Sequence, residues 1–404
     1  MARTPTSRNS IYYLYFYLKK TFIISVFILT FFAKLFAQST DDSLIHTLLK
    51  DIAAMQVSAD GEFYAGTFPS FRDCGGAPHN YQPDNNIFFT AVSAFALRNM
   101  LPSLNNENRK IAENIIAKIQ PVYPYYKNQF GNPYYGFWPT HSIIMPHTFI
   151  FQYLKSVFGQ GEDADDSIMI LMTDSSGDST AALLKKQLEA VSNLSSPKRK
   201  IISTYKKYRD IPAYSTYLGN RMVPDFDFAV QCNIMYFILE KKLSFTLQDT
   251  ATIELLADMV KERKYMDAPT YISPYYVSSP ILLYHLCRLM GSFKIPELEK
   301  FKPQIIADIK QQLQSTTNVM DKIILSTSLM RLGEKAPYIE LPSINDFEES
   351  NQNLFVFFQA RAAFSYPSPL KEIGLQWSYI YYRFYSPAYN KILWLEYLVN
   401  RKSH

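Results

Sequence analysis

The chain has only three cysteines, Cys74, Cys232 and Cys287, among its 404 residues. An odd number of thiols allows at most one disulfide, and no two of these cysteines have the spacing of zinc ligands. Cys232 and Cys287 lie in apolar runs, where a thiol behaves as a small buried hydrophobic side chain. A disulfide framework and a zinc site are therefore disfavoured. The 48% of residues that are hydrophobic must supply the stability.

No apolar run reaches the roughly 20 residues that a membrane helix needs. The candidate at residues 21–33 is followed at once by Lys34 and preceded by four basic residues, Arg3, Arg8, Lys19 and Lys20. Basic residues, a short apolar stretch and a small residue near Ala37 are typical of an export signal. We therefore expect residues 1–37 to be a signal peptide, or alternatively a retained anchor. Residues 38–404 would then form one domain in the periplasm or cell envelope.

Net charge is also low once this leader is set aside. The leader carries five basic residues and no acidic one, so the formal charge of +5 falls to 0 over residues 38–404. A nucleic-acid partner requires an excess of basic charge. The basic stretch "SPKRK" at 196–200 is too short to supply it. We expect no nucleic-acid partner.

Aromatic residues are abundant, with 30 Tyr and 29 Phe. Many lie in two tyrosine-rich segments, "YPYYKNQFGNPYYGFW" (123–138) and "YISPYYVSSP" (271–280). A tyrosine ring is apolar while its hydroxyl prefers water or a polar partner. We expect these segments to line a surface or a cavity.

Helical periodicity recurs along the chain and strand-like alternation is scarce, which predicts an all-α fold. We expect fourteen helices between Asp41 and Asn400, with no composition that would indicate a linker between domains. Among these expected helices are Pro146–Phe158, Pro197–Tyr208, Pro296–Gln314 and Asn353–Phe364.

Apolar helices alternate with amphipathic ones. Several apolar helices follow Asp, Asn or Ser, as in "QPDNNIFFTAVSAFALRNM" (82–100) and "VPDFDFAVQCNIMYFILEKK" (223–242). A degenerate repeat of helix pairs places apolar helices inside and amphipathic ones outside. With about six pairs, we expect closure into a single α/α toroid. All inner helices would then start on one face, and their capping carboxylates would converge around one cavity mouth.

The segment "DADDSIMILM" (163–172) resembles the Asp-x-Asp-Asp motif of class II terpene cyclases. Helix pairs with acidic starts are similar to the terpenoid cyclase and protein prenyltransferase toroids, over roughly residues 45–400. Exported bacterial proteins of unsettled role also resemble these toroids. The resemblance implies that Asp165 is a general acid that protonates an alkene or epoxide, and that Asp163 and Asp166 orient it.

The aromatic side chains Tyr134, Tyr135, Phe137 and Trp138 would supply faces for carbocations in such an enzyme. The chain departs from the family in two respects. It lacks the repeated Gln-Trp motifs of triterpene cyclases, and the zinc ligands of prenyltransferases have no counterpart. The expected partner is an apolar small molecule or lipid, with peripheral contact with a membrane.

Other roles for these residues stay open. Asp163, Asp165 and Asp166 would equally cap a helix. Carboxylates from different helix starts could serve a glycan-active hydrolase or lyase, with Asp84, Asn86, Asp225 and Asp227 at the same mouth. A non-enzymatic envelope protein that binds lipid, glycan or protein is the third alternative.

No resident cofactor or metal site is predicted. The exception is a Ca²⁺ or Mg²⁺ ion bound by Asp163, Asp165 and Asp166, with Asp174 and Asp178 as further oxygen ligands. His79, His141 and His147 are expected in loops or at helix starts near the tyrosine-rich segments, and His285 in the core. Cys74 is the thiol expected to be accessible.

Overall fold

The computed structural model describes residues 41–74, 81–140, 161–175, 177–219, 222–344, 346–347, 355–361, 366–375 and 381–403. The chain divides into two compact units, Met1–Thr47 and Leu48–His404. Residues 41–47 are the described part of the first unit and are helical. The leader at 1–37 and the helix expected at Pro146–Phe158 lie outside the described residues. Residues 48–404, the second unit, contain the helices and the sheet described next.

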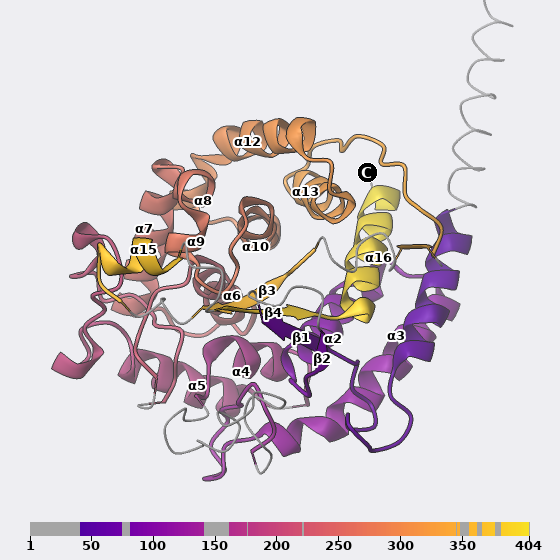
Figure 1. Ribbon diagram of the computed structural model, residues 1–404, viewed down its shortest axis with the longest axis horizontal. Helices are drawn as coiled ribbons and strands as arrows, with labels where there is room; N and C mark the ends of the chain where they lie inside the picture. Colours follow the sequence, from indigo (N-terminus) through magenta and orange to yellow (C-terminus); the bar gives the residue numbers. More distant parts are fainter. Residues whose placement is uncertain are drawn as a thin grey trace, which may run out of the picture. The chain divides into compact units, whose positions relative to one another are not determined.

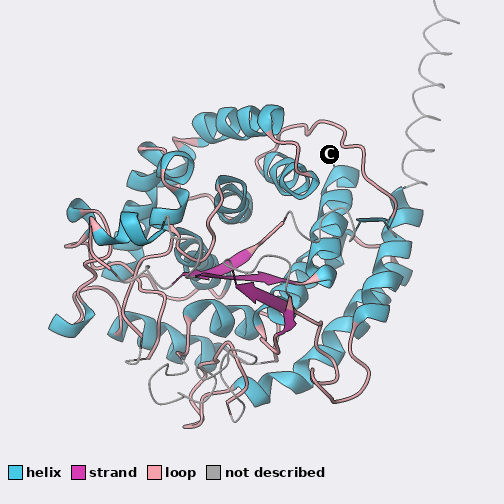
Figure 2. Cartoon of the chain, viewed as in Figure 1, coloured by secondary structure: helices cyan, strands magenta, loops and turns pink. Residues whose placement is uncertain are grey.

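This unit is mostly helical, as predicted (Figures 1 and 2). Six helices each pack against the next, and the last packs against the first. In order they are α2 (Phe88–Met100), α4 (Ala164–Leu171), α6 (Phe228–Glu240), α10 (Ser279–Ser292), α13 (Val319–Arg331) and α16 (Pro387–Ser403). They are buried on nearly all sides; in α6 every residue from Phe228 to Ile238 is buried. Helices that are apolar all round are stable only inside a protein.

More polar helices pack on the outside of this cycle. They are α3 (Asn106–Ile119) on α2, α5 (Asp178–Ala190) on α4, α7 (Leu247–Lys261) on α6, and α12 (Lys302–Ser315) on α10 and α13. In α3 the residues buried are Asn108, Ala112, Ile115 and Ile119, which lie on one stripe. Burial therefore follows the alternation that the sequence predicts. The remaining short helices are α8 (Lys264–Asp267), α9 (Pro269–Ile272), α11 (Pro296–Glu299) and α15 (Leu370–Leu375).

A four-stranded antiparallel sheet was not expected from the sequence. Its order is β2 (Gln82–Pro83), β1 (Phe71–Cys74), β4 (Tyr381–Tyr385) and β3 (Phe358–Arg361). Phe71 pairs with Tyr385, and Phe384 pairs with Phe358. In Figure 2 these strands lie among the helices. The ring of Phe358 packs on Phe88 at the start of α2, 5.1 Å between centroids, and on Tyr276 before α10, 5.7 Å.

Three helix expectations were wrong in whole or in part. The described end of Asn353–Phe364 is strand β3, because Phe358 packs among aromatic rings and pairs with β4. Pro197–Tyr208 holds only two single turns, η4 (Pro197–Arg199) and η5 (Lys206–Tyr208). Its middle, "IIST", combines β-branched and hydroxyl side chains, which disfavour a helix. Pro296–Gln314 is broken into α11 and α12.

Gly66 allows a close approach between the loop after the first described helix and α3. Its φ is +96°, and a Cβ there would lie 2.1 Å from the Lys118 carbonyl oxygen. We expect Gly66→Ala to lower the free energy of unfolding by at least about 2 kcal/mol, because the conformation and the contact both exclude a methyl group. Gly61→Ala is the control, since a Cβ at Gly61 meets no atom within 4 Å. Urea denaturation measures both, and equal stability of the two variants would contradict this account.

None of the helices that the structure describes is both long enough and apolar enough to span a membrane.

Candidate functional site

Acidic side chains gather where three neighbouring inner helices begin. Asp84 precedes α2, Asp163 is the N-cap of α4, and Asp227 is the N-cap of α6. We call the six carboxyl groups at these starts the acidic cluster: Asp84, Asp163, Asp165, Asp166, Asp225 and Asp227. Asp163 is half-buried, and the other five are at most 5% exposed. Asp163 and Asp227 are N-caps as predicted, whereas Asp84 and Asp225 lie before the N-caps Ile87 and Asp227 and cap neither helix.

Asp84 is neutralised by a basic side chain. Its Oδ2 lies 2.9 Å from Arg72 Nε, and both groups are buried. Its Oδ1 accepts hydrogen bonds from Asn86 Nδ2 and Trp138 Nε1, each at 3.0 Å. Burial raises the pKa of Asp84, while Arg72 and the two donors lower it. Asn86 and Trp138, two residues predicted to bind substrate, thus both bond to Asp84. These hydrogen bonds fix the segment that precedes α2.

Asp163 and Asp166 form a pair of neighbouring carboxyl groups. Asp163 Oδ1 caps α4 by accepting the backbone N–H of Asp166 at 2.8 Å. Burial raises the pKa of Asp163 to about 7. Burial and then the charge of Asp163 hold the pKa of Asp166 well above its ordinary value. Apart from this neighbour, neither oxygen of Asp166 has a hydrogen-bond partner among the described residues. Both shifts favour a proton on this pair, and Asp166, which lacks other donors in the described part of the chain, is the carboxyl group whose neutral form is the more strongly favoured.

Asp165 is buried and accepts hydrogen bonds from two side chains. Its Oδ1 accepts from Asn233 Nδ2 at 2.7 Å, and its Oδ2 accepts from the Tyr276 hydroxyl. Burial raises its pKa, whereas these two hydrogen bonds and the charge of Arg288 lower it. Such partners stabilise the ionised form. The terpene cyclase resemblance implies that Asp165 is a general acid. The surroundings of Asp166, which has no such donors among the residues described, suit that role better than those of Asp165.

A chain of buried polar groups continues from Asp165 along α6 and α10. Asn233 Oδ1 accepts from Arg288, and Arg288 also donates to His285 Nδ1 at 3.0 Å. Asn233 Oδ1 also lies 3.0 Å from His285 Nδ1, so Nδ1 accepts from Arg288 in one tautomer and donates to Asn233 in the other. Burial, and then the charge of Arg288, hold the pKa of His285 well below its ordinary value. His285 is buried and neutral, as expected for a core histidine.

Asp225 and Asp227 form the second carboxyl pair. Asp227 caps α6 through the backbone N–H of Ala229 and Val230, at 2.9 and 3.1 Å, and accepts from the Ser273 hydroxyl at 2.7 Å. Burial raises the pKa of Asp227 to about 7 despite these bonds. Burial likewise raises the pKa of Asp225 to about 7, and the Lys371 ammonium is the largest opposing influence. Both groups titrate near neutral pH.

Two tyrosines lie between the carboxyl pairs. The hydroxyls of Tyr217 and Tyr275 are 2.6 Å apart. Tyr217 forms a backbone bridge with Asp163, and the Tyr275 N–H donates to Asp227 Oδ2 at 3.2 Å. The charges of Asp225 and Asp227 act on both phenols, and burial raises their pKa values most. The tyrosine pair therefore joins the start of α4 to the start of α6.

Lys371, on α15, is the basic residue whose charge acts on Asp225. It is 1% exposed, and its Nζ donates to the Ser203 carbonyl oxygen at 2.6 Å and lies 4.5 Å from the Tyr271 ring centroid. Burial lowers its pKa to about 8, and the charges of Asp225 and Asp227 oppose that shift. A protonated Lys371 thus supplies positive charge to a region rich in carboxyl groups.

The predicted aromatic residues separate into two groups. Phe137 packs on Phe358 and Phe384, at 5.5 and 5.1 Å between ring centroids, and so contacts the sheet. The Tyr135 N–H donates to Ser167 Oγ at 3.0 Å and fixes the loop against α4. Tyr134 is half-buried, and its hydroxyl reaches Gln187 on α5, away from the acidic cluster.

Sequence reasoning missed Tyr217, Asn233 and Lys371 altogether. Tyr275 and Tyr276 lie in the second tyrosine-rich segment, which was noticed for its composition but not assigned to the acidic residues. The sequence does contain a signal for Tyr275 and Tyr276. Their segment directly precedes α10, and all inner helices are expected to start on the same face as the acidic residues.

Comparison with family models, with curated proteins and with solved structures returned no match. Within the described ranges, no group of three or more His, Cys, Asp or Glu side chains has the arrangement of a metal site. Asp178 opens α5 and is exposed. His79, His141, His147 and the side chain of Cys74 lie outside the described residues. Cys232 and Cys287 are free and buried, as predicted.

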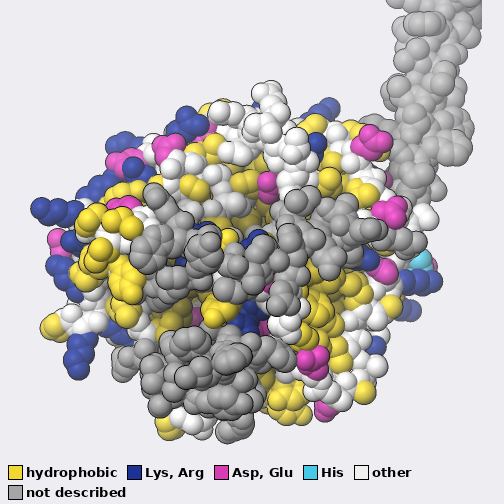
Figure 3. Space-filling view, in the orientation of Figure 1, with side chains coloured by type: hydrophobic (Ala, Val, Ile, Leu, Met, Phe, Trp, Pro, Cys, Tyr) yellow, Lys and Arg dark blue, Asp and Glu magenta, His cyan; other side chains and the backbone are white. Residues whose placement is uncertain are grey.

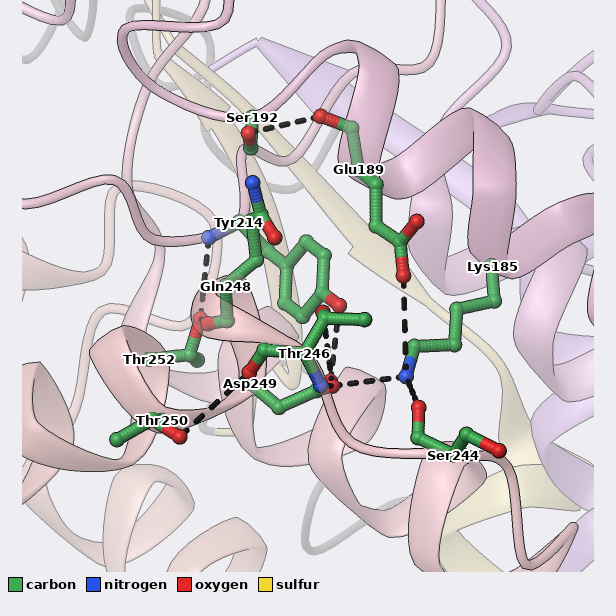
Figure 4. Close-up of polar contacts among 10 residues, drawn as sticks. All are labelled: Lys185, Glu189, Ser192, Tyr214, Ser244, Thr246, Gln248, Asp249, Thr250 and Thr252. Atoms are coloured by element: carbon green, nitrogen blue, oxygen red, sulfur yellow. Dashed lines mark hydrogen bonds and ion pairs between the residues drawn. The ribbon is translucent and has the colours of Figure 1, made fainter.

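A fully satisfied acidic residue elsewhere provides a contrast (Figure 4). Asp249 on α7 is buried, and its oxygens accept from Lys185 Nζ at 2.7 Å, from the Tyr214 hydroxyl at 2.8 Å and from the Thr246 N–H at 2.5 Å. This set closes a capping box and ties α5 to α7. Asp249 is a structural carboxylate, whereas Asp166 lacks comparable donors among the residues described.

Proposed function

We propose that residues 48–404 form an α/α toroid whose acidic cluster is an acid–base catalytic site. The closed cycle of contacts from α2 through α16 back to α2 supports the architecture. The leader supports export to the periplasm or cell envelope. One observation carries the catalytic role. Carboxyl groups at the start of α4 and at the start of α6 have pKa values raised to about 7, and the hydroxyls of Tyr217 and Tyr275 lie between them.

Asp166 is the acid in this proposal. A general acid must hold its proton at working pH and release it to a leaving group, and burial beside the Asp163 carboxyl favours that state. Once Asp166 has released its proton, its charge and that of Asp163 repel each other, and this repulsion favours return of a proton to Asp166. The same arrangement makes Asp165 a positioning residue, anchored by Asn233 and Tyr276.

Asp225 is the base. The Lys371 ammonium favours its ionised form, so one carboxyl group of the site is charged while another is neutral. In hydrolysis Asp225 removes a proton from water, the water oxygen bonds to the electrophilic carbon, and Asp166 gives its proton to the departing oxygen. Two carboxyl groups with opposed protonation are what glycoside hydrolysis requires.

The polar groups of this site favour a hydroxyl-rich substrate, most simply a glycan. Carboxyl groups, the hydroxyls of Tyr217 and Tyr275 and the Lys371 ammonium offer hydrogen bonds to sugar hydroxyls. A long isoprenoid would need an apolar cavity inside the helix cycle. Phe357 and Phe358 already pack there, against His285, Tyr389 and Phe88.

Acid-catalysed isomerisation or cyclisation of an isoprenoid is the second candidate. A protonated Asp166, fully buried and close to the aromatic loop that holds Tyr135, favours it. The two reactions differ in their need for Asp225. Hydrolysis needs a base for water, whereas protonation of an alkene does not use Asp225.

The test compares wild type with Asp166→Asn and Asp225→Asn on a glycan panel and on polyprenols, squalene and carotenoids, read by mass spectrometry. For a glycan hydrolase we expect both variants to lose at least about 100-fold in kcat/KM while they stay folded. Loss in Asp166→Asn alone, on an isoprenoid, would support the second candidate. Asp210→Asn, an exposed residue outside the cluster, is the control. A folded wild type that binds a ligand and turns nothing over would make the protein a binding module and overturn the catalytic proposal.

A further inference from the structure

One segment on the outside of the second unit is strongly basic. Residues 196–210, "SPKRKIISTYKKYRD", contain six Lys or Arg and one acidic residue. Lys198, Lys200 and Lys206 are exposed, while Arg199 is buried and donates to the Gly219 carbonyl oxygen at 2.7 Å. Ile202, between the lysines, is 45% exposed. The segment therefore presents ammonium groups around an aliphatic side chain.

Helix α15 lies directly on this segment. Lys371 points inward and donates to Ser203, and the Tyr205 ring packs 4.4 Å from the ring of Tyr271, on the neighbouring helix α9. The opposite face of α15 carries Leu370 and Ile373, which are 57% and 50% exposed. Two aliphatic side chains of this short helix are thus exposed, and Ile202 is the residue before Ser203, which Lys371 of the same helix contacts.

We define the basic–apolar patch as Ile202, Leu370 and Ile373 with Lys198, Lys200 and Lys206. Figure 3 shows hydrophobic side chains gathered on the side of the unit where Figure 1 places α15, with Lys and Arg along the same edge. Exposed aliphatic side chains that cluster, rather than scatter, mark a contact surface. None of the patch residues belongs to the acidic cluster or contacts it.

We propose that the basic–apolar patch docks on an anionic lipid bilayer. Aliphatic side chains within a basic rim match the two layers of such a surface, because the chains enter the acyl boundary while the lysines meet lipid phosphates. Lys200 pairs with Asp210, and Lys207 pairs with Asp258 and Glu262, so Lys198 and Lys206 supply most of the positive charge that the negative surface attracts. An acidic protein would also match the lysines, and the experiment below separates it from a bilayer.

The experiment places an environment-sensitive NBD fluorophore in the full chain at Ile202→Cys or Ile373→Cys, with Cys74→Ser so that the new thiol is the one labelled. The probe is titrated with vesicles of phosphatidylcholine alone or with 30% phosphatidylglycerol. We expect the emission to shift to the blue and to rise several-fold with anionic vesicles only, and the shift to be lost in 0.5 M NaCl. The probe reads the patch itself, so attachment through another part of the chain leaves it unchanged.

Two controls make the result specific. Leu247→Cys on α7, at a side chain that is 67% exposed, should show no shift. Lys198→Glu with Lys206→Glu should weaken the shift at Ile202→Cys roughly 30-fold or more in lipid concentration, from about 1 kcal/mol for each lysine. An equal shift at Leu247→Cys, or none at Ile202→Cys and Ile373→Cys, would overturn the proposal. A shift with an acidic protein but not with vesicles would replace the bilayer by a protein partner.

Discussion

The protein should become more stable as the pH falls from 7.5 to 5. The pKa values of Asp163, Asp225 and Asp227 are raised by burial from 3.8 to about 7 in the folded chain. Between these two values the folded chain binds protons that the unfolded chain has released. Acidification therefore favours folding, and the stabilisation is complete below the unfolded pKa and lost as the pH rises through about 7.

The expected size is large for a marginally stable fold. Each such group contributes up to about 1.4 kcal/mol per pH unit within its window, so three groups give several kcal/mol between pH 5 and 7. Burial also raises the pKa values of Asp84, Asp165 and Asp166, which act in the same direction. His285 opposes them, because its folded pKa is held below 6.5, but it is one group against six.

Urea denaturation at pH 5, 6, 7 and 8 measures this dependence. Asp225→Asn cannot ionise, so it should flatten the curve by the contribution of one group and raise stability at pH 8 relative to wild type. Asp210→Asn, whose side chain is 78% exposed, should leave the slope unchanged. Stability that rises with pH across this range would mean that the cluster is ionised and paired in the folded chain.

The starts of the inner helices were the part of the site that the sequence predicts well. Asp163 and Asp227 precede apolar runs and cap α4 and α6 as expected, because an N-cap is a local interaction between a side chain and the next few backbone N–H groups. The ordering of apolar and amphipathic helices follows from side-chain periodicity for the same reason.

The partners of these carboxyl groups depend on distant segments. Tyr276 bonds to Asp165 across 111 residues, and Asn233 does so across 68. Nothing near Asp165 in sequence distinguishes it from Asp166. In the fold, however, Asp165 has two hydrogen-bond donors, whereas Asp166 has, within the ranges that the structure describes, only its acidic neighbour Asp163. The sheet was missed for a related reason. β1 pairs with β4, and Asp73 and Arg383, which are 310 residues apart, form a salt bridge across that pairing.

Loss of Glu396 should be the most damaging single change in the helix cycle. This residue of α16 is 5% exposed, its carboxylate pairs with Arg331 of α13, and its Oε2 accepts from the Tyr284 hydroxyl of α10 at 2.7 Å. Glu396→Ala leaves the Arg331 guanidinium inside the protein without its counter-charge. We expect a loss of about 3–5 kcal/mol in the free energy of unfolding.

The matched control is the exposed pair of Lys310 and Glu334, 2.7 Å apart. Glu334→Ala also removes the carboxylate of a direct ion pair, but water solvates the remaining lysine, so we expect a loss of less than about 1 kcal/mol. A double variant, Arg331→Met with Glu396→Leu, removes both buried charges and should recover most of the stability of wild type. If Glu396→Ala cost no more than Glu334→Ala, water would have to reach Arg331 between α13 and α16. The contact between α13 and α16 would then be hydrated rather than packed.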